Sequence, residues 1–235
     1  MHRNLIQSWG FWAGVLIASI VGVVCIPWDL EISQFVQSIK IPGDLRKAVN
    51  LSEAFGHTIG PVAIFFTLIW IDIRNRKKLF KAALFTAICG ISANAAKYVI
   101  PRLRPHSLDM AETEIATSWD TWGTPWTGSW FDEHLRSFPS GHSATAVAFA
   151  IGLYQVYPRG KWIFFTIAAL ACFQRLVSSA HFLSDIMGGT VLSLLISLWY
   201  WRGEHANNVN QECTIDETIA PNTLASPQRK SAATE

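Results

Sequence analysis

A run of 20 residues without a single charge, from Trp9 to Trp28, most constrains what this chain can fold into. Twenty helical residues extend for about 30 Å, which is the hydrocarbon thickness of a bilayer. The apolar region of a secretory signal peptide is shorter, about 7–15 residues, and ends at a cleavage site of small residues that is not evident here. We therefore expect a retained transmembrane helix.

Further apolar stretches recur along the chain, and only 15% of its 235 residues are charged, against about 25% in a soluble domain. Lipid offers no partners to an open backbone, so each spanning stretch must be helical. The pattern predicts an all-α, polytopic membrane bundle of six transmembrane helices. The expected spans are about residues 9–28, 56–72, 82–100, 140–157, 161–179 and 182–201.

Residues 1–202 are expected to form this membrane domain, with a motif-bearing core at about residues 50–200. The loop 29–55 contains a possible short amphipathic helix around Leu45 to Phe55. Residues 203–235 are polar and lack an apolar period, which predicts a disordered cytoplasmic tail.

Basic residues predict the orientation, because cytoplasmic loops carry an excess of Lys and Arg. Residues 74–81 hold five basic residues, and Arg159 and Lys161 follow the fourth expected span. We expect both termini in the cytoplasm and an integral protein of the bacterial inner membrane. The opposite loops would then face the periplasm or the outside.

Three blocks carry charge where apolar stretches end. They are Lys97 to Pro105, Pro139 to His142, and Arg175 with His181 and Asp185. An ionisable group at membrane depth is costly and indicates function by default. The expected topology brings all three blocks to the outer membrane face, which predicts one site.

Three cations of these blocks, Lys97, Arg104 and Arg175, need an anion to compensate them. A phosphate group suits them, since Arg forks match its geometry and Lys supplies a point charge. Ser140 and Gly141 begin a helix, with Ser140 as a plausible N-cap, and a helix N-terminus binds anions through free N–H groups. A simple cap is the plainer interpretation of Ser140 alone.

His181 and Asp185 are four residues apart and would share a helix face. Asp185 can accept from one ring nitrogen of His181 and leave the other free to attack, as a nucleophile with its orienting partner. His142 is a second imidazole for acid–base chemistry. His57 is interpreted as a packing residue.

Metals and other partners are disfavoured by the same residues. Three cations would repel a divalent ion, so we expect no metal and no cofactor. The net charge of +2 is too small to indicate a nucleic-acid partner. The cysteines lack a metal-binding spacing and are interpreted as small hydrophobes; they are Cys25, Cys89, Cys172 and Cys213.

At these blocks the chain resembles the type 2 phosphatidic acid phosphatase family, which shares its core with vanadium haloperoxidases and glucose-6-phosphatase. Lys97 to Pro105 matches Lys-x6-Arg-Pro, and Pro139 to His142 matches Pro-Ser-Gly-His. Arg175 to Asp185 matches Arg-x5-His-x3-Asp, but Gln174 replaces the family's usual Ser.

The resemblance implies a role for each matching residue. His181 would attack phosphorus to form a phosphohistidine, His142 would protonate the leaving oxygen and then activate water, and Asp185 would orient His181. The phosphoryl oxygens would be held by Lys97, Arg104, Ser140, Gly141 and Arg175.

The expected substrate is a membrane lipid with a phosphate head group: a polyprenyl pyrophosphate, phosphatidic acid, phosphatidylglycerol phosphate or a lipid A type phosphate. Alternatives are a lipid phosphotransferase, a vanadate-dependent haloperoxidase and an anion transporter. Tryptophans between Trp119 and Trp130 favour an irregular flap on the lipid surface near the site, although a self-packed loop is the alternative.

Overall fold

The computed structural model describes residues 9–110, 115–124 and 132–201. The chain divides into two compact units, residues 1–197 and residues 198–235, and only the first four residues of the second unit are described. The expected disordered tail at 203–235 lies outside the described residues.

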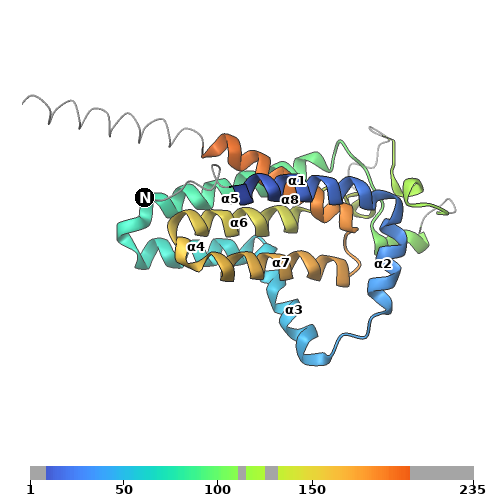
Figure 1. The fold of residues 1–235 in the computed structure, drawn as a ribbon, viewed down its shortest axis with the longest axis horizontal. Coiled ribbons are helices and arrows are strands. Elements are labelled where there is room, and N and C mark those ends of the chain that lie inside the picture. Colours follow the sequence, from blue (N-terminus) through green and yellow to red (C-terminus); the bar gives the residue numbers. More distant parts are fainter. Residues whose placement is uncertain (1–8, 111–114, 125–131, 202–235) are drawn as a thin grey trace, which may run out of the picture. The chain divides into compact units, whose positions relative to one another are not determined.

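Helices account for nearly all of the regular structure, which confirms the all-α class (Figure 1). The longer ones are α1 (Trp9–Cys25), α2 (Asp29–Ser38), α3 (Gly43–Gly56), α4 (Ile59–Ile71), α5 (Arg76–Ala96), α6 (Gly141–Val156), α7 (Lys161–Val177) and α8 (Leu183–Tyr200). Short 3-10 helices link them at Ile26–Trp28, Ile73–Asn75, Pro105–Met110, Ser118–Thr121, Glu133–Leu135 and Pro158–Gly160.

Four helical segments of the described chain are long and apolar enough to cross a membrane: Trp9–Ser38, Ile73–Ala96, Pro158–Val177 and Leu183–Tyr200. A fifth is formed if α3 and α4, which meet at a 69° bend, count as one span. The protein is therefore an integral membrane protein. The predicted count of six is not confirmed, because α6 coincides with the fourth expected span but has only 16 residues.

The helix α6 lies at the centre and packs against α5, α7 and α3. Its buried positions include many alanines, and such small residues let neighbouring helices approach closely in membrane proteins. Gly152 shows this directly, since a Cβ atom there would lie 3.1 Å from the Cβ of Ala82 on α5.

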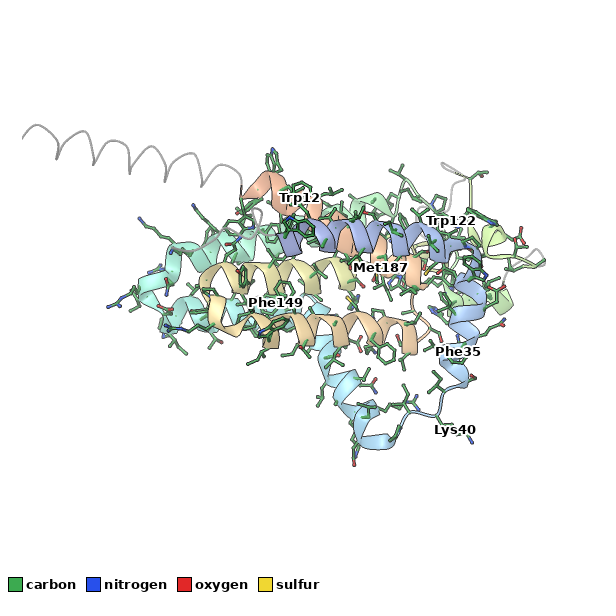
Figure 2. The ribbon with its side chains drawn as sticks, viewed as in Figure 1. Trp12, Phe35, Lys40, Trp122, Phe149 and Met187 are labelled. Carbon is green, nitrogen blue, oxygen red and sulfur yellow. The ribbon has the colours of Figure 1, made fainter. Side chains whose placement is uncertain are left out.

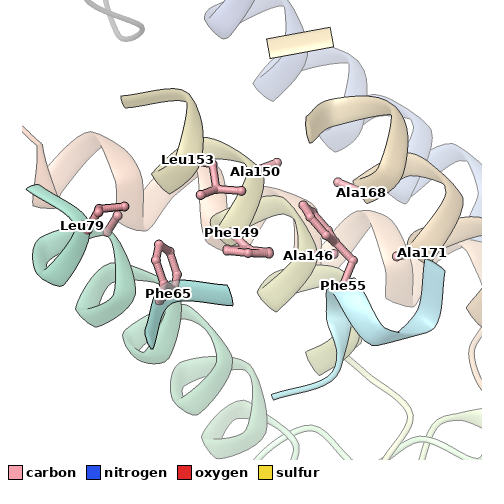
Figure 3. Close-up of a cluster of buried hydrophobic side chains, with 10 residues drawn as sticks. Phe55, Phe65, Leu79, Ala146, Phe149, Ala150, Leu153, Ala168 and Ala171 are labelled. Carbon is pink, nitrogen blue, oxygen red and sulfur yellow. The ribbon is translucent and has the colours of Figure 1, made fainter. Parts of the chain in front are cut away.

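Phenylalanines fill the space around this central helix (Figure 3). The ring of Phe149 on α6 lies 4.5 Å from that of Phe55 on α3 and 4.9 Å from that of Phe65 on α4, measured between centroids. Both distances fall in the range of favourable aromatic pairs. The cluster fixes α3 and α4 against α6, and those helices form one wall of the site described below.

The segment between the first two expected spans is more helical than predicted. The amphipathic helix expected around Leu45 to Phe55 is confirmed as α3, but α2 was not predicted. Figure 1 shows α2 and α3 running across the direction of the other helices. Figure 2 shows Phe35 on α2 and Lys40 in the link between α2 and α3. Both helices contact α7.

The two ends of the bundle differ. At one end, the Tyr157 hydroxyl donates to the Asp72 carboxylate at 2.8 Å and ties the loop after α6 to the loop after α4. At the other end lie the last residues of α5 and α7 and the first residues of α6 and α8. Every motif of the three charged blocks therefore falls at this second end.

Candidate active site

A cavity of about 600 Å³ opens where the three charged blocks meet. Its charged and polar lining combines residues of α5, α6 and α7, the loops that follow α5 and α7, and His57 between α3 and α4. These residues are His57, Asn94, Lys97, Arg104, Gly141, His142, Arg175 and His181.

Two cations of the cavity lack a neutralising partner among the described residues. Lys97 caps the C-terminus of α5 and is 9% exposed. Burial is the main cause that lowers its pKa to about 8, and the nearby charge of Arg104 adds to the effect. Arg104 keeps a buried Nε atom without a hydrogen-bond partner. Buried donors are normally paired, so this end of the cavity is built to receive an anion.

The third cation, Arg175, already contacts an acid that the sequence did not indicate. Its guanidinium lies 2.6 Å from the carboxylate of Glu53 on α3. Gln174 joins the same cluster, because its amide donates to Glu53 at 3.1 Å and its carbonyl accepts from Arg175 Nε at 2.6 Å. The residue that departs from the family pattern thus links Arg175 to Glu53.

The start of α6 is fixed from two sides. The Ser140 side chain accepts from the Ser143 N–H at 3.4 Å, which confirms its N-cap role. Its own N–H donates to the Asp185 carbonyl at 3.0 Å and so joins α6 to α8. Gly141 lines the cavity, whereas Ser140 is fully buried and is not among the described lining residues. Its predicted contact with phosphate therefore rests on the resemblance alone.

His181 and Asp185 are adjacent, but a third residue intervenes. His181 Nδ1 lies 3.7 Å from Asp185 Oδ2, which is longer than a hydrogen bond. The Ser137 hydroxyl donates to the same Oδ2 at 2.5 Å and lies 3.4 Å from His181 Nδ1. Ser137 was missed because it stands outside the matching blocks.

The imidazole of His181 is neutral at pH 7. Burial lowers its pKa to about 4, although the negative charge of Asp185 nearby acts in the opposite direction. A pKa well below 7 keeps the ring unprotonated at neutral pH. With Nδ1 directed towards Ser137 and Asp185, Nε2 is the nitrogen available for attack.

Two further histidines lie on the cavity. His142 has a buried Nε2 atom with no hydrogen-bond partner among the described residues. The ring of His57 lies 5.6 Å from that of His142, between centroids. His57 is exposed and lines the cavity, so the interpretation of His57 as a packing residue is wrong.

The tryptophan loop is described only in part, and Trp126 and Trp130 lie outside the described residues. Trp119 is exposed. Trp122 packs inward, with its ring 5.2 Å from that of Phe138 and under the guanidinium of Arg102. The self-packed alternative therefore holds for Trp122.

Below its charged end, the cavity continues between α4 and α5 with an apolar lining. The lining residues there are Pro61, Val62, Phe65, Phe66, Ile69, Phe80, Ala83, Ala87 and Ile91. From Phe80 to Lys97, α5 rises by about 25 Å at 1.5 Å per residue, so the lining follows most of the length of this helix. One cavity thus combines a cationic end with a long apolar wall.

Three curated relatives, all named lipid A 1-phosphatase, share sequence with this chain. The Porphyromonas gingivalis protein is 32% identical over 53% of this chain and 24% of its own length. The Rhizobium etli protein is 34% identical over 52% of this chain and 50% of its own. The Rhizobium johnstonii protein is 31% identical, with 68% of each chain covered. The chain therefore spans half or less of the length of the first two relatives.

Two solved structures share the fold. The crystal structure of a transmembrane PAP2 type phosphatidylglycerolphosphate phosphatase from Bacillus subtilis gives a TM-score of 0.58. The two chains are 19% identical over 85% of this chain and 98% of the other. The crystal structure of Aquifex aeolicus LpxE gives a TM-score of 0.52, with 21% identity over 74% of this chain and 94% of its own. The model of the PAP2 superfamily matches residues 78–208, more than half of the chain, which contain all three charged blocks. The chain belongs to the PAP2 superfamily.

Proposed function

We propose that this protein is a membrane lipid phosphatase that removes a phosphate group from the head of a lipid through a phosphohistidine on His181, without a metal. The observation that carries the proposal is the cavity itself. Lys97, Arg104 and Arg175 line its charged end, and an apolar lining continues between α4 and α5. A phosphate on a hydrocarbon chain has the matching distribution of charge and apolar surface.

In the first step, His181 Nε2 attacks phosphorus, and the bond from phosphorus to the lipid oxygen breaks. His142 donates a proton to that oxygen, so the lipid leaves as a neutral alcohol, or as a phosphate if the substrate is a diphosphate. The cations and the N–H of Gly141 at the start of α6 stabilise the charge that develops on the phosphoryl oxygens. Stabilisation of this kind is usually the largest contribution to catalysis.

In the second step, water attacks the phosphohistidine. His142 accepts a proton from the water, the bond between nitrogen and phosphorus breaks, and inorganic phosphate leaves. Asp185 faces Nδ1 of His181 throughout and stabilises the positive charge that the ring carries while it is phosphorylated. Ser140, as the cap of α6, acts by holding the N-terminus of that helix at the site.

The 1-phosphate of lipid A is the substrate that the relatives favour, since three of them carry that activity in their names. Phosphatidylglycerol phosphate is the second candidate, from the Bacillus subtilis structure. Polyprenyl pyrophosphate and phosphatidic acid complete the set to be tested, and transfer of the phosphate to another acceptor is tested in parallel.

The charged end of the cavity is proposed to face the periplasm of a bacterial inner membrane, with both termini in the cytoplasm. The basic residues that follow α4 and α6 lie at the opposite end of the bundle, near the contact of Tyr157 with Asp72, which agrees with the excess of positive charge in cytoplasmic loops. Residues 1–202 would form the membrane domain and residues 203–235 a cytoplasmic tail.

The test is phosphate release by the detergent-purified protein from the four lipid phosphates, each in mixed micelles. We expect release, fastest from the 1-phosphate of lipid A. Lack of release from all four, by a protein that is folded and monodisperse, would contradict the proposal. Bromide oxidation in the presence of vanadate would instead support the haloperoxidase, and phosphate flux into liposomes without hydrolysis would support the transporter.

A further inference from the structure

The most completely buried cation of the described chain, Arg102, lies outside the cavity. Its side chain is 0% exposed, and it is not among the described residues that line the cavity. The sequence offered only a basic residue in an outer loop. A fully buried arginine is rare unless its charge and its donors are all satisfied.

The surroundings of Arg102 satisfy both requirements. Its guanidinium lies between two rings, 4.3 Å from the centroid of Trp122 and 4.4 Å from that of Phe182. Its donors reach four side chains: Thr121 from Nε at 3.2 Å, Ser184 and Asp185 from Nη1 at 2.7 and 2.5 Å, and Asp29 from Nη2 at 2.7 Å. Figure 2 shows Trp122 at the end of the bundle near the junction of α1 and α2.

Asp29 is the second acid that pairs with Arg102. It lies in the first turn of α2 and is also 0% exposed. One carboxylate oxygen accepts from the Ser184 N–H at 3.1 Å, and the other accepts from Arg102 and from the Ser184 hydroxyl. A carboxylate at the N-terminus of α8 is favourable because it pairs with free N–H groups and with the helix dipole.

The position of α2 is fixed by a separate set of contacts. The Ser118 hydroxyl donates to the Pro27 carbonyl at 3.0 Å, and it accepts from the Leu30 N–H at 3.1 Å. The loop between the first two charged blocks is therefore tied to the start of α2. This contact places Asp29 against Arg102 even though 73 residues separate them in the chain.

Arg102, which also pairs with Asp29, fixes the position of the Asp185 carboxylate. Arg102 holds Oδ1, while the Ser137 hydroxyl and the Phe182 N–H, at 2.5 and 2.9 Å, hold Oδ2. Both oxygens are thus fixed, and Oδ2 is the one that faces His181. The cluster of Arg102, Asp29 and Asp185 contains one positive and two negative charges.

We propose that Arg102, anchored by Asp29, is a positioning residue that fixes Asp185 and thereby orients His181 for attack. The inference rests on the proposed phosphatase function and adds two residues to its machinery. Neither Arg102 nor Asp29 would touch the substrate. Their loss should therefore lower kcat and leave KM nearly unchanged, whereas Arg104, which lines the cavity, should affect KM when replaced.

The experiment compares Arg102→Met, Arg102→Lys and Asp29→Asn with the wild type in detergent, on the lipid phosphate that the wild type hydrolyses best. We expect kcat to fall about 10–100-fold in Arg102→Met, as is typical when a group that orients an active-site ligand is lost. Arg102→Lys keeps the charge and should recover part of the loss. Tyr157→Phe, at the far end of the bundle, is the control for a lost, partly buried hydrogen bond between side chains and should keep wild-type kcat.

A double-mutant cycle separates positioning from a purely structural role. If Arg102 acts through Asp185, then Arg102→Met should cost little further kcat in a background of Asp185→Asn, because the interaction is already lost. Additive losses in the cycle would overturn the inference, as would unchanged kcat in Arg102→Met or a rise of KM in proportion to the loss.

Folding is monitored for each variant by size exclusion and thermal unfolding. Arg102→Met leaves two buried carboxylates without their cation, so it can fail to fold; in that case Arg102→Lys and the double variant Arg102→Met/Asp29→Asn carry the test. Wild-type kcat in the double variant overturns the inference, as does a kcat in Arg102→Lys no higher than in the double variant. If the wild type itself releases no phosphate from any lipid, the proposed function fails and the inference falls with it.

Discussion

The carboxylate of Glu53 lies 2.6 Å from the guanidinium of Arg175, so one of the three cations of the cavity already holds an anion. Glu53 belongs to α3, outside the family's three motifs, and its side chain is 40% exposed. A substrate phosphate that binds Arg175 must either share the guanidinium with the Glu53 carboxylate or displace that carboxylate. Glu53 thus links the affinity for phosphate to the position of α3.

Glu53→Gln removes this competing charge while keeping the shape of the side chain. We expect KM for the lipid phosphate, and the inhibition constant of inorganic phosphate, to fall about 2–5-fold, as suits a partly exposed ion pair. Glu31→Gln, an exposed acid on α2, is the matched control and should change neither. A higher KM in Glu53→Gln would mean that Glu53 orients Arg175 instead of competing for it.

The pH dependence should reflect Lys97. Because burial lowers its pKa to about 8, the ammonium loses its proton as the pH rises through 8, and the charged end of the cavity loses one of its cations. kcat/KM, which reports the free enzyme, should therefore fall above pH 8. The groups that influence this titration are Arg104, Asp185 and Arg136.

Lys97→Arg tests this assignment, since a guanidinium stays charged beyond pH 12. The alkaline limb of kcat/KM should move to higher pH in that variant. Lys161→Arg, at the other end of the bundle, should keep the wild-type limb. An alkaline limb that stays in place in Lys97→Arg would assign the titration to another group.

The apolar wall between α4 and α5 should bind the hydrocarbon part of the substrate. Ala87→Trp places a large ring in this part of the cavity, so KM for a long-chain lipid phosphate should rise about tenfold, or ~1.4 kcal/mol. A water-soluble aryl phosphate should be hydrolysed as before. Leu84→Trp, on α5 but outside the described lining, is the control. Equal effects of Ala87→Trp on both substrates would argue against a chain-binding wall.

Removal of metal ions should leave the activity intact. Lys97, Arg104 and Arg175 line the charged end of the cavity. In the proposed reaction they would supply the positive charge that a divalent ion would otherwise provide, and they would also repel such an ion. Phosphate release in excess EDTA should match that in buffer. Loss of activity in the chelator, restored by Mg²⁺, would refute a metal-free reaction.

The meeting of the three blocks could be predicted from the sequence, because helix spans of similar length return the chain to the same end at every second boundary. Lys97, His142 and His181 reach one cavity for this reason. Gln174 was recognised as a departure from the family pattern, but its contact with Glu53 was not, since 121 residues separate the two.

The partners of Asp185 could not be predicted in the same way. Arg102 reads as an ordinary basic residue of an outer loop, and Asp29 as the polar end of an apolar run. Only the folded loops and α2 bring them together, by contacts over 73 and 83 residues of sequence. Hydropathy carries no information on such pairings, and neither does the spacing of a local motif.

The covalent intermediate on His181 tests the central claim most directly. Lipid phosphate carrying a radioactive phosphorus atom is mixed with the purified protein, the reaction is quenched under alkaline conditions that preserve phosphohistidine, and the labelled peptide is sequenced. We expect label on His181, more of it in His142→Ala because hydrolysis of the intermediate is slowed, and none in His181→Ala, which should still insert into the membrane. Phosphate release at the wild-type rate by His181→Ala, or label on a different residue, would contradict the account.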